Sequence, residues 1–288
     1  MIKELVVISG KGGTGKTSVT ASFAVLAGDA VLADCDSDAA DLHLVLSPEV
    51  IEKNEFRSGH EAIIRQDDCT ACGMCEEYCR YDAIRIKGGN FSVDPASCEG
   101  CGVCVWFCPA DAIDFPQRIS GHWMISETRC GPMVHAKLGV AQENNGKLVS
   151  VVRKEARRLA EEKKKELIIV DGPPGIGCPV IASVTGASQL LIVTEPTVAG
   201  EHDMERVLDL AAHFGVPASI CVNKWDLNPE VAERIEKRAS SLGGSVVGRI
   251  RYDPGVTKAQ VEALSVVETD APSAADIREI WRSINGGN

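Results

Sequence analysis

Eight of the twelve cysteines fall into two runs that share one spacing. Each run reads C-x2-C-x2-C-x3-C, and the second begins 29 residues after the first and ends in Cys-Pro. Asp-Ala-Ile follows at the same offset in both copies, so the block is an internal duplication. Thiolates at such intervals are ligands for iron–sulfur or zinc centres. The runs are Cys69, Cys72, Cys75 and Cys79, and Cys98, Cys101, Cys104 and Cys108.

The spacing is that of two-cluster bacterial ferredoxins, which residues 59–118 resemble. In this pattern three cysteines of one run hold a [4Fe–4S] cluster, and the fourth ligates the other cluster. A zinc site fits poorly, because it takes two C-x2-C pairs a dozen or more residues apart. Arg80 stands where a proline would follow, which changes the local turn and charge but not the ligands. The expected ligand sets are Cys69, Cys72, Cys75 and Cys108, and Cys79, Cys98, Cys101 and Cys104.

A glycine-rich loop follows the first apolar stretch of the chain. We expect a buried strand at Leu5–Ile8 and a helix over Thr17–Leu26, with G-x-x-x-x-G-K-[ST] between them. Backbone N–H groups of such a loop bind phosphate at a helix N-terminus. Lys16 is expected to contact the β- and γ-phosphates and Thr17 to coordinate Mg²⁺. The expected nucleotide-binding residues here are Gly10, Lys11, Gly12, Gly13, Thr14, Gly15, Lys16, Thr17 and Ser18.

Lys11, directly after the first loop glycine, makes the loop similar to the deviant P-loop of the MinD/ParA/Mrp and nitrogenase iron protein superfamily. The resemblance covers nearly all of the chain outside the insert. It implies that Lys11 crosses a dimer interface to the partner's nucleotide and acts with Lys16 and Asp36 in catalysis. It also implies that Asp36 and Asp171 lie near Mg²⁺.

Other strand ends continue the resemblance. Val31–Asp34 looks like the strand that enters switch I, in which Asp34 is either a second switch aspartate or a helix cap. Leu167–Val170 runs into Asp171 and a rigid turn that places Gly175 near the γ-phosphate. Leu190–Val193 is the next strand. The resemblance assigns the adenine contacts to Asn223, Lys224, Tyr252 and Pro254, although the first two could form an ordinary turn.

Strands that alternate with helices and carry motifs at their carboxyl ends predict an α/β fold with a doubly wound, mostly parallel sheet. We expect a P-loop ATPase domain at residues 1–58 and 119–288, with an inserted α+β ferredoxin-like domain at 59–118. The flanks, 48–59 and 116–121, are expected to be exposed loops, where domain insertion succeeds.

Four cysteines lie outside the repeats. Cys35 and Cys221 are in apolar strands and are expected to be buried. Cys178 follows Asp171 by seven residues, the offset of a cluster ligand in the nitrogenase iron protein, so a third, bridging cluster with Cys130 is a hypothesis. His135 is expected to be a loop or switch residue rather than a ligand.

Composition excludes several function classes. The net charge of −11 and 5% aromatic content argue against specific nucleic-acid binding. No apolar run reaches the roughly 18 residues of a membrane span, and the N-terminus lacks a signal pattern, so we expect a cytoplasmic protein. The apolar residues of the last helical stretch are expected to pack on their own domain rather than on a membrane. They are Ile277, Ile280, Trp281 and Ile284.

The combined expectation is an ATPase with ATP, Mg²⁺ and two [4Fe–4S] clusters as cofactors. Dimer closure would couple ATP to electron transfer, or to iron–sulfur or metallocofactor maturation. The alternatives are a MinD/ParA-like positioning or regulatory switch with redox-sensing clusters, and an iron–sulfur scaffold with weak ATPase activity. The expected partners are a second copy or a paralogue, and a redox partner or assembly client. No C-x-x-C follows residue 104, which weakens a cluster-carrier function.

Overall fold

The computed structural model describes residues 2–36, 41–139 and 146–286. It divides into two compact units. Unit 1 comprises Met1–Lys53, Trp123–Lys137 and Asn144–Asn288, and unit 2 comprises Asn54–His122 and Leu138–Glu143. The expected boundaries at 59 and 118 therefore fall inside unit 2.

The expectation of exposed loops at the flanks of the insert was wrong. Both flanks are strands, β3 (Glu49–His60) and β8 (Gln117–Thr128), and each passes from one unit into the other along the chain. They are neighbours in one sheet, so backbone hydrogen bonding, which an insertion loop would lack, orders both connections.

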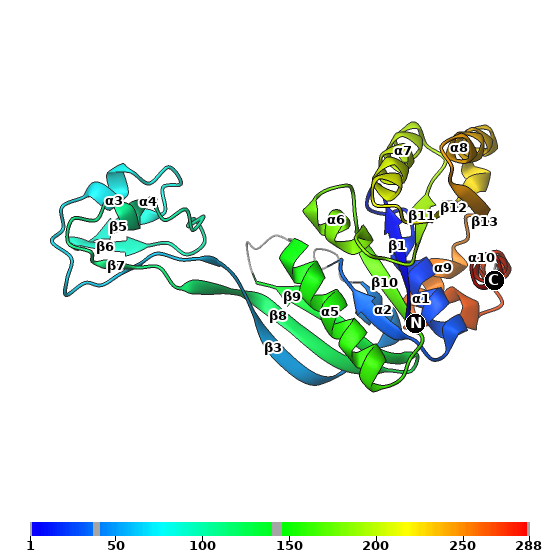
Figure 1. Ribbon diagram of the computed structural model, residues 1–288, viewed down its shortest axis with the longest axis horizontal. Coiled ribbons are helices and arrows are strands. Elements are labelled where there is room, and N and C mark those ends of the chain that lie inside the picture. Colours follow the sequence, from blue (N-terminus) through cyan, green and yellow to red (C-terminus); the bar gives the residue numbers. More distant parts are fainter. Residues whose placement is uncertain (1, 37–40, 140–145, 287–288) are drawn as a thin grey trace. The chain divides into compact units, whose positions relative to one another are not determined.

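The main sheet has the strand order β13-β12-β11-β1-β10-β2-β9-β8-β3 (Figure 1). The pairs from β13 to β9 are parallel, which confirms a mostly parallel α/β sheet. Its first seven strands are β1 (Lys3–Ser9), β2 (Val31–Asp34), β9 (Gly131–Leu138), β10 (Leu167–Pro174), β11 (Gln189–Thr194), β12 (Ala218–Asn223) and β13 (Ser245–Ile250).

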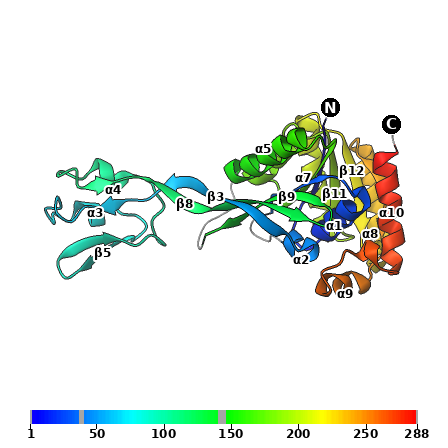
Figure 2. The same ribbon diagram turned by 90° about the horizontal axis from the view of Figure 1, so that it is seen from below.

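Helices cover both faces of this sheet, which explains why strands such as β1 are buried along nearly their whole length. Figure 2 shows α5 on one side and α1 with α2 on the other. The helices of unit 1 are α1 (Lys16–Ala27), α2 (Leu42–Leu46), α5 (Gly146–Glu162), α6 (Cys178–Val184), α7 (Val198–His213), α8 (Pro229–Ser241), α9 (Gly255–Val261) and α10 (Pro272–Asn285), with 3₁₀ turns η1 (Trp225–Leu227) and η2 (Val266–Glu268).

The last helix, α10, packs on its own unit as expected. Ile277, Ile280 and Ile284 are buried, and the Trp281 ring lies 4.9 Å from the ring of Phe23 in α1. In the part of the chain that the structure describes, no helix is long and apolar enough to cross a membrane.

Unit 2 is built from two short antiparallel pairs and two one-turn helices. Its core is small, and six of the repeat cysteines pack against it. Helices α3 and α4 each begin after a glycine with positive φ, Gly73 and Gly102, so the duplicated sequence gives a duplicated local structure. The elements are β4 (Ile63–Ile64), α3 (Met74–Glu77), β5 (Ile84–Lys87), β6 (Asn90–Val93), α4 (Val103–Trp106) and β7 (Ile113–Asp114).

Candidate functional site

Two glycines in the loop between β1 and α1 lie where the surrounding atoms leave no room for a Cβ. Gly15, with φ of 90°, precedes α1, and a Cβ there would lie 2.3 Å from Nδ2 of Asn223. A Cβ on Gly10 would lie 2.2 Å from Cβ of Asp203 in α7. Both glycines allow the loop to curl at the carboxyl end of β1, with the N-terminus of α1 behind it.

Lys16, the first residue of α1, lies in a buried cluster of carboxylates. Its Nζ is 2.8 Å from Oδ1 of Asp171 and 3.2 Å from Oδ2 of Asp36. The Thr17 hydroxyl donates to Oδ2 of Asp171 at 2.8 Å, and the hydroxyl of Thr20 lies 2.9 Å from Oδ1. The three residues expected at the Mg²⁺ site, Thr17, Asp36 and Asp171, therefore meet around one ammonium group.

Sequence reasoning missed Thr20, since no loop motif includes it. The signal that could have found it is its place one turn after Lys16, on the same face of α1.

Burial and charge oppose each other at this cluster. Burial lowers the pKa of Lys16, but attraction to Asp171 and Asp36 outweighs it, so the pKa is raised and the ammonium stays charged. Burial, followed by the charge of Asp171, raises the pKa of Asp34 well above its ordinary value. Asp34 accepts the N–H of Asp36 through Oδ1, and its buried Oδ2 has no hydrogen-bond partner. Asp34 is thus a buried member of the acidic cluster. Residues 37–40, which belong to the expected switch I, lie outside the described residues.

A cavity of about 430 Å³ opens over the loop. Its lining combines polar residues of the loop, including Lys16, with the apolar side chains of Ile250, Val256 and Ile277. Gln260 and Arg251, which sequence reasoning missed, also line it. The expected residues that line it are Gly12, Gly13, Thr14, Gly15, Lys16, Thr17, Ser18, Asp36, Asn223, Lys224 and Tyr252.

The other expected residues lie behind or beside the cavity wall. Asp171 lies beneath Lys16, and Gly175 donates its N–H to the carbonyl of Ser9. The turn expected before Gly175 is still strand, since β10 extends to Pro174. Pro254 caps α9. Gly10 and Lys11 are also outside the lining.

The residues assigned to adenine connect the loop with two strand ends. Asn223 donates from Nδ2 to the carbonyl of Thr14 at 2.7 Å, and Lys224 donates from Nζ to that of Gly13 at 3.1 Å. Asp226 accepts the N–H of Tyr252 at 2.7 Å and so fixes the loop after β13. Asn223 and Lys224 are therefore parts of the cavity wall that are hydrogen-bonded to the phosphate loop.

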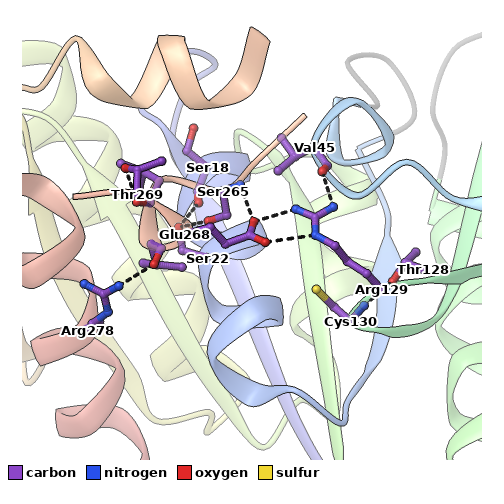
Figure 3. A network of polar contacts seen from close by, with 12 residues as sticks. Ser18, Ser22, Val45, Thr128, Arg129, Cys130, Ser265, Glu268, Thr269 and Arg278 are labelled. Atoms are coloured by element: carbon purple, nitrogen blue, oxygen red, sulfur yellow. Dashed lines mark hydrogen bonds and ion pairs between the residues drawn. The ribbon is translucent and has the colours of Figure 1, made fainter. Parts of the chain in front are cut away.

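A polar network joins α1 to the turn between β8 and β9 (Figure 3). Hydroxyls of Ser22 and Ser265 are 2.9 Å apart, and Glu268 accepts the N–H of Ser265. Arg129, in the turn, donates to Glu268 and to the carbonyl of Val45 at the end of α2. The network thus ties the phosphate-loop helix to α2, the helix that follows Asp36 in the sequence.

In unit 2 the cysteines line two separate pockets. Each pocket takes three cysteines from one run and the last cysteine of the other. Backbone N–H groups of Ala83 and Ala112 donate to the sulfurs of Cys79 and Cys108 at 3.4 and 3.3 Å. The first pocket has Cys69, Cys72, Cys75 and Cys108; the second has Cys79, Cys98, Cys101 and Cys104.

Each pocket offers four thiols, and a cubane takes one thiolate at each of its four irons, so the residues present fit such a group. Among the described residues, no group of three or more His, Cys, Asp or Glu side chains is placed to hold a single metal ion. Burial, then the charges of Cys98 and Cys101, raise the pKa of Cys104 to about 11. Binding a metal centre would therefore displace a proton from the Cys104 thiol.

The remaining cysteines do not form a common site. Cys130 is buried in the β8–β9 turn beside Ala30, at the amino end of β2, whereas Cys178 is exposed after the carboxyl end of β10. These are opposite ends of the parallel sheet, so the structure separates the two residues of the hypothetical third cluster within the chain. Cys35 and Cys221 are buried, as expected.

His135 is buried in β9, not in a loop, and is 2.8 Å from the hydroxyl of Ser126. Burial, then the charge of His43, lowers its pKa to about 4.

The fold and the phosphate site define a P-loop nucleotide-binding protein. The model of the CobQ/CobB/MinD/ParA nucleotide binding domain family matches residues 5–266, and the chain belongs to this family. It is 37% identical to the uncharacterized protein MJ0578 of Methanocaldococcus jannaschii over 79% of this chain and 80% of that protein. The uncharacterized protein MJ0579 of the same organism is 24% identical over 77% of this chain and 80% of its own.

Solved structures of MinD share the fold. MinD of Aquifex aeolicus has a TM-score of 0.60 at 18% identity and covers 100% of this chain and 98% of its own. The septum site-determining protein MinD of Pyrococcus horikoshii, solved with Mg-ADP, has a TM-score of 0.58 at 16% identity. The similarity covers 99% of this chain and 96% of that protein. Proteins of the MinD/ParA family are ATPases, and this chain is an ATPase.

Proposed function

We propose that the chain is a nucleotide-dependent switch of the MinD/ParA type whose unit 2 holds two [4Fe–4S] clusters that make the switch sensitive to redox state. The observation that carries the proposal is the joint presence of the Lys16–Asp171–Asp36 cluster and of two pockets with four cysteines each. The family supports the nucleotide half, and the chemistry of the thiols supports the other half.

In the proposed nucleotide site each residue has a role that its position allows. Lys16 contacts the β- and γ-phosphates, and Thr17 holds Mg²⁺ together with Asp36 and Asp171. Gly175, whose N–H now bonds to Ser9, would approach the γ-phosphate. Catalysis would come from positioning and from charge stabilisation, the main contributions in phosphoryl transfer.

The proposed partner is a second copy of the chain or a paralogue, since MinD/ParA proteins generally dimerise. The net charge of −11 does not favour nucleic acid as a partner, and a cytoplasmic location fits the family. Lys11, which lies outside the cavity of its own chain, is then the residue that contacts the partner's nucleotide.

A second candidate function is ATP-gated electron transfer or metallocofactor maturation. It is favoured by the exposure of Cys72 and Cys101, one in each pocket, because exposed ligands give a redox partner or client access to both centres. Bound clusters would supply low-potential one-electron chemistry.

Anaerobic reconstitution followed by iron analysis tests the clusters. We expect about eight irons per chain, by the arithmetic of two cubanes. Cys72→Ala and Cys101→Ala should each lower the iron content, whereas Cys178→Ala, an exposed cysteine outside both pockets, should not. An iron content near zero in the reconstituted protein would contradict the proposal.

A redox titration with electron paramagnetic resonance, with and without MgATP, separates the two candidate functions. A change of about 59 mV in a one-electron potential corresponds to a tenfold change in the equilibrium constant. A shift of that size on addition of MgATP supports the redox-sensing switch. Because the coupling between the nucleotide site and the clusters is reciprocal, the affinity for MgATP should then also depend on the oxidation state of the clusters. ATP turnover that rises only when an electron acceptor such as methyl viologen is supplied favours electron transfer.

A further inference from the structure

Glu195, the residue after β11, pairs with two lysines that flank the phosphate loop. Its Oε1 is 2.5 Å from Nζ of Lys11, and its Oε2 is 3.6 Å from Nζ of Lys224. The Lys11 ammonium also reaches Oγ1 of Thr197 at 3.5 Å. One carboxylate thus pairs with two ammonium groups that a nucleotide's phosphates would attract.

The contacts have a consequence for Lys11. Lys16 and Lys224 line the nucleotide cavity, but Lys11 does not, although it belongs to the same loop. Its side chain is 33% exposed, against 6% for Lys16, so water can reach the pair and Lys11 can exchange its partner without unfolding the loop.

We propose that Glu195 is a positioning residue that holds Lys11 out of the phosphate site in the nucleotide-free chain and competes with phosphate for it. The Lys11 ammonium that Glu195 holds lies outside the lining of the nucleotide cavity, so it must leave the carboxylate before it can donate to phosphate oxygens in that cavity. Phosphate oxygens, in the chain's own nucleotide or in that of a second copy, must then displace Glu195. The inference deepens the proposed switch and rests on its nucleotide half, not on the clusters.

The expected size of the effect follows from the exposure of the pair. Partly exposed ion pairs change equilibria by about twofold to fivefold. Removing the charge of Glu195 should therefore favour the Lys11–phosphate contact by a factor of about three.

Steady-state ATPase assays on Glu195→Gln test the proposal. We expect the KM for MgATP to fall about threefold in this variant. The protein concentration that gives half-maximal specific activity should fall by the same factor, and kcat should stay within about twofold of the wild-type value. The matched control is Glu201→Gln, whose side chain is also 17% exposed and pairs with Arg234 at 2.7 Å. It should leave all three quantities unchanged.

The Lys11→Ala background separates competition from a structural role. Glu195→Gln should lower KM less there than in the wild-type background, because only the longer contact of Glu195 with Lys224 remains. An equal fall of KM in both backgrounds, or a KM that is unchanged or raised in Glu195→Gln alone, overturns the proposal.

If Glu195→Gln does not fold, Glu195→Asp keeps the charge on a shorter side chain and should give a smaller fall in KM of the same sign. A rise in KM for Glu195→Asp would also overturn the proposal. Iron content and cluster spectra should not change in these variants, so failure here is distinguishable from failure of the cluster hypothesis.

Discussion

At the scale of single residues, the hydroxyl of Thr20 supports the buried Lys16–Asp171 pair. It lies 2.9 Å from Oδ1 of Asp171, whose side chain is fully buried. We expect Thr20→Val to lower the free energy of unfolding by about 1–3 kcal/mol, because a buried carboxylate loses a hydrogen-bond donor.

Urea denaturation of the nucleotide-free protein measures this effect. Thr185→Val is the control, since its exposed hydroxyl donates only to a helix carbonyl, and it should change stability by less than about 0.5 kcal/mol. Equal effects of the two substitutions would contradict the role given to Thr20.

His135 makes the stability of unit 1 depend on pH. Its pKa is lowered to about 4 in the folded protein, against about 6.5 when unfolded, so the unfolded chain binds more protons between these values. Stability should therefore fall as the pH drops from 6.5 to 4, by about 3 kcal/mol from this residue.

His135→Gln should remove that part of the loss, whereas His202→Gln, on an exposed side chain, should not. Denaturation midpoints at a series of pH values give the comparison. Parallel curves for the wild type and His135→Gln would show that His135 does not titrate in this way.

Local motifs let the sequence predict the phosphate loop, but contacts between residues distant in the sequence could not be predicted. The strand, loop and helix around Gly15 and Lys16 follow from residues next to one another. Thr20 and Asp171 are 151 positions apart, and Lys11 meets Glu195 only because β11 lies beside β1. No pattern within either segment encodes such pairs.

At the scale of elements, the strands β3 and β8 were missed for a related reason. β3 is mostly exposed and lacks the alternation of a half-buried strand. Its neighbours in the sheet, rather than its own composition, decide its conformation, which is the usual limit of strand propensity. The paired repeats of unit 2, in contrast, are visible in the sequence because duplication preserves their spacing.

Arg129 connects elements that the sequence keeps apart. It joins the β8–β9 turn to η2 through Glu268 and to α2 through the carbonyl of Val45. Arg129→Gln should lower the free energy of unfolding by about 1–3 kcal/mol, since a buried carbonyl and the Glu268 carboxylate both lose donors. Arg158→Gln, which breaks only exposed ion pairs within α5, should cost less than about 1 kcal/mol in the same assay. Equal costs would mean that the Arg129 contacts do not stabilise the fold.

At the scale of the whole molecule, the two units differ in what stabilises them. Unit 1 has a large core between its sheet and helices, whereas the core of unit 2 has five buried apolar residues and depends on packed cysteines. A core of this size buries too little apolar surface to stabilise a fold alone, so such units are usually stabilised by metal centres or other cross-links. Calorimetry of the reconstituted protein should therefore show two transitions.

Iron chelation should abolish the transition of unit 2, and MgATP should raise mainly the temperature of the unit 1 transition. The control is chelator added to Cys178→Ala, which should behave as the wild type does. A single transition that responds equally to both treatments would contradict separate stabilisation of the two units.

The neighbouring strands β3 and β8 also bear on how such a chain can arise. The polypeptide leaves unit 1 along one strand and returns along the strand beside it, and Ser120 in β8 donates its hydroxyl to the carbonyl of Ser58 in β3. The two ends of the intervening segment are therefore close together, as in a hairpin whose turn has been replaced by residues 61–116. A gene can gain or lose such a cassette by one recombination event within a turn, and the order of the other strands is unaffected. The same route would allow a compact unit of this kind to be exchanged between proteins of this family.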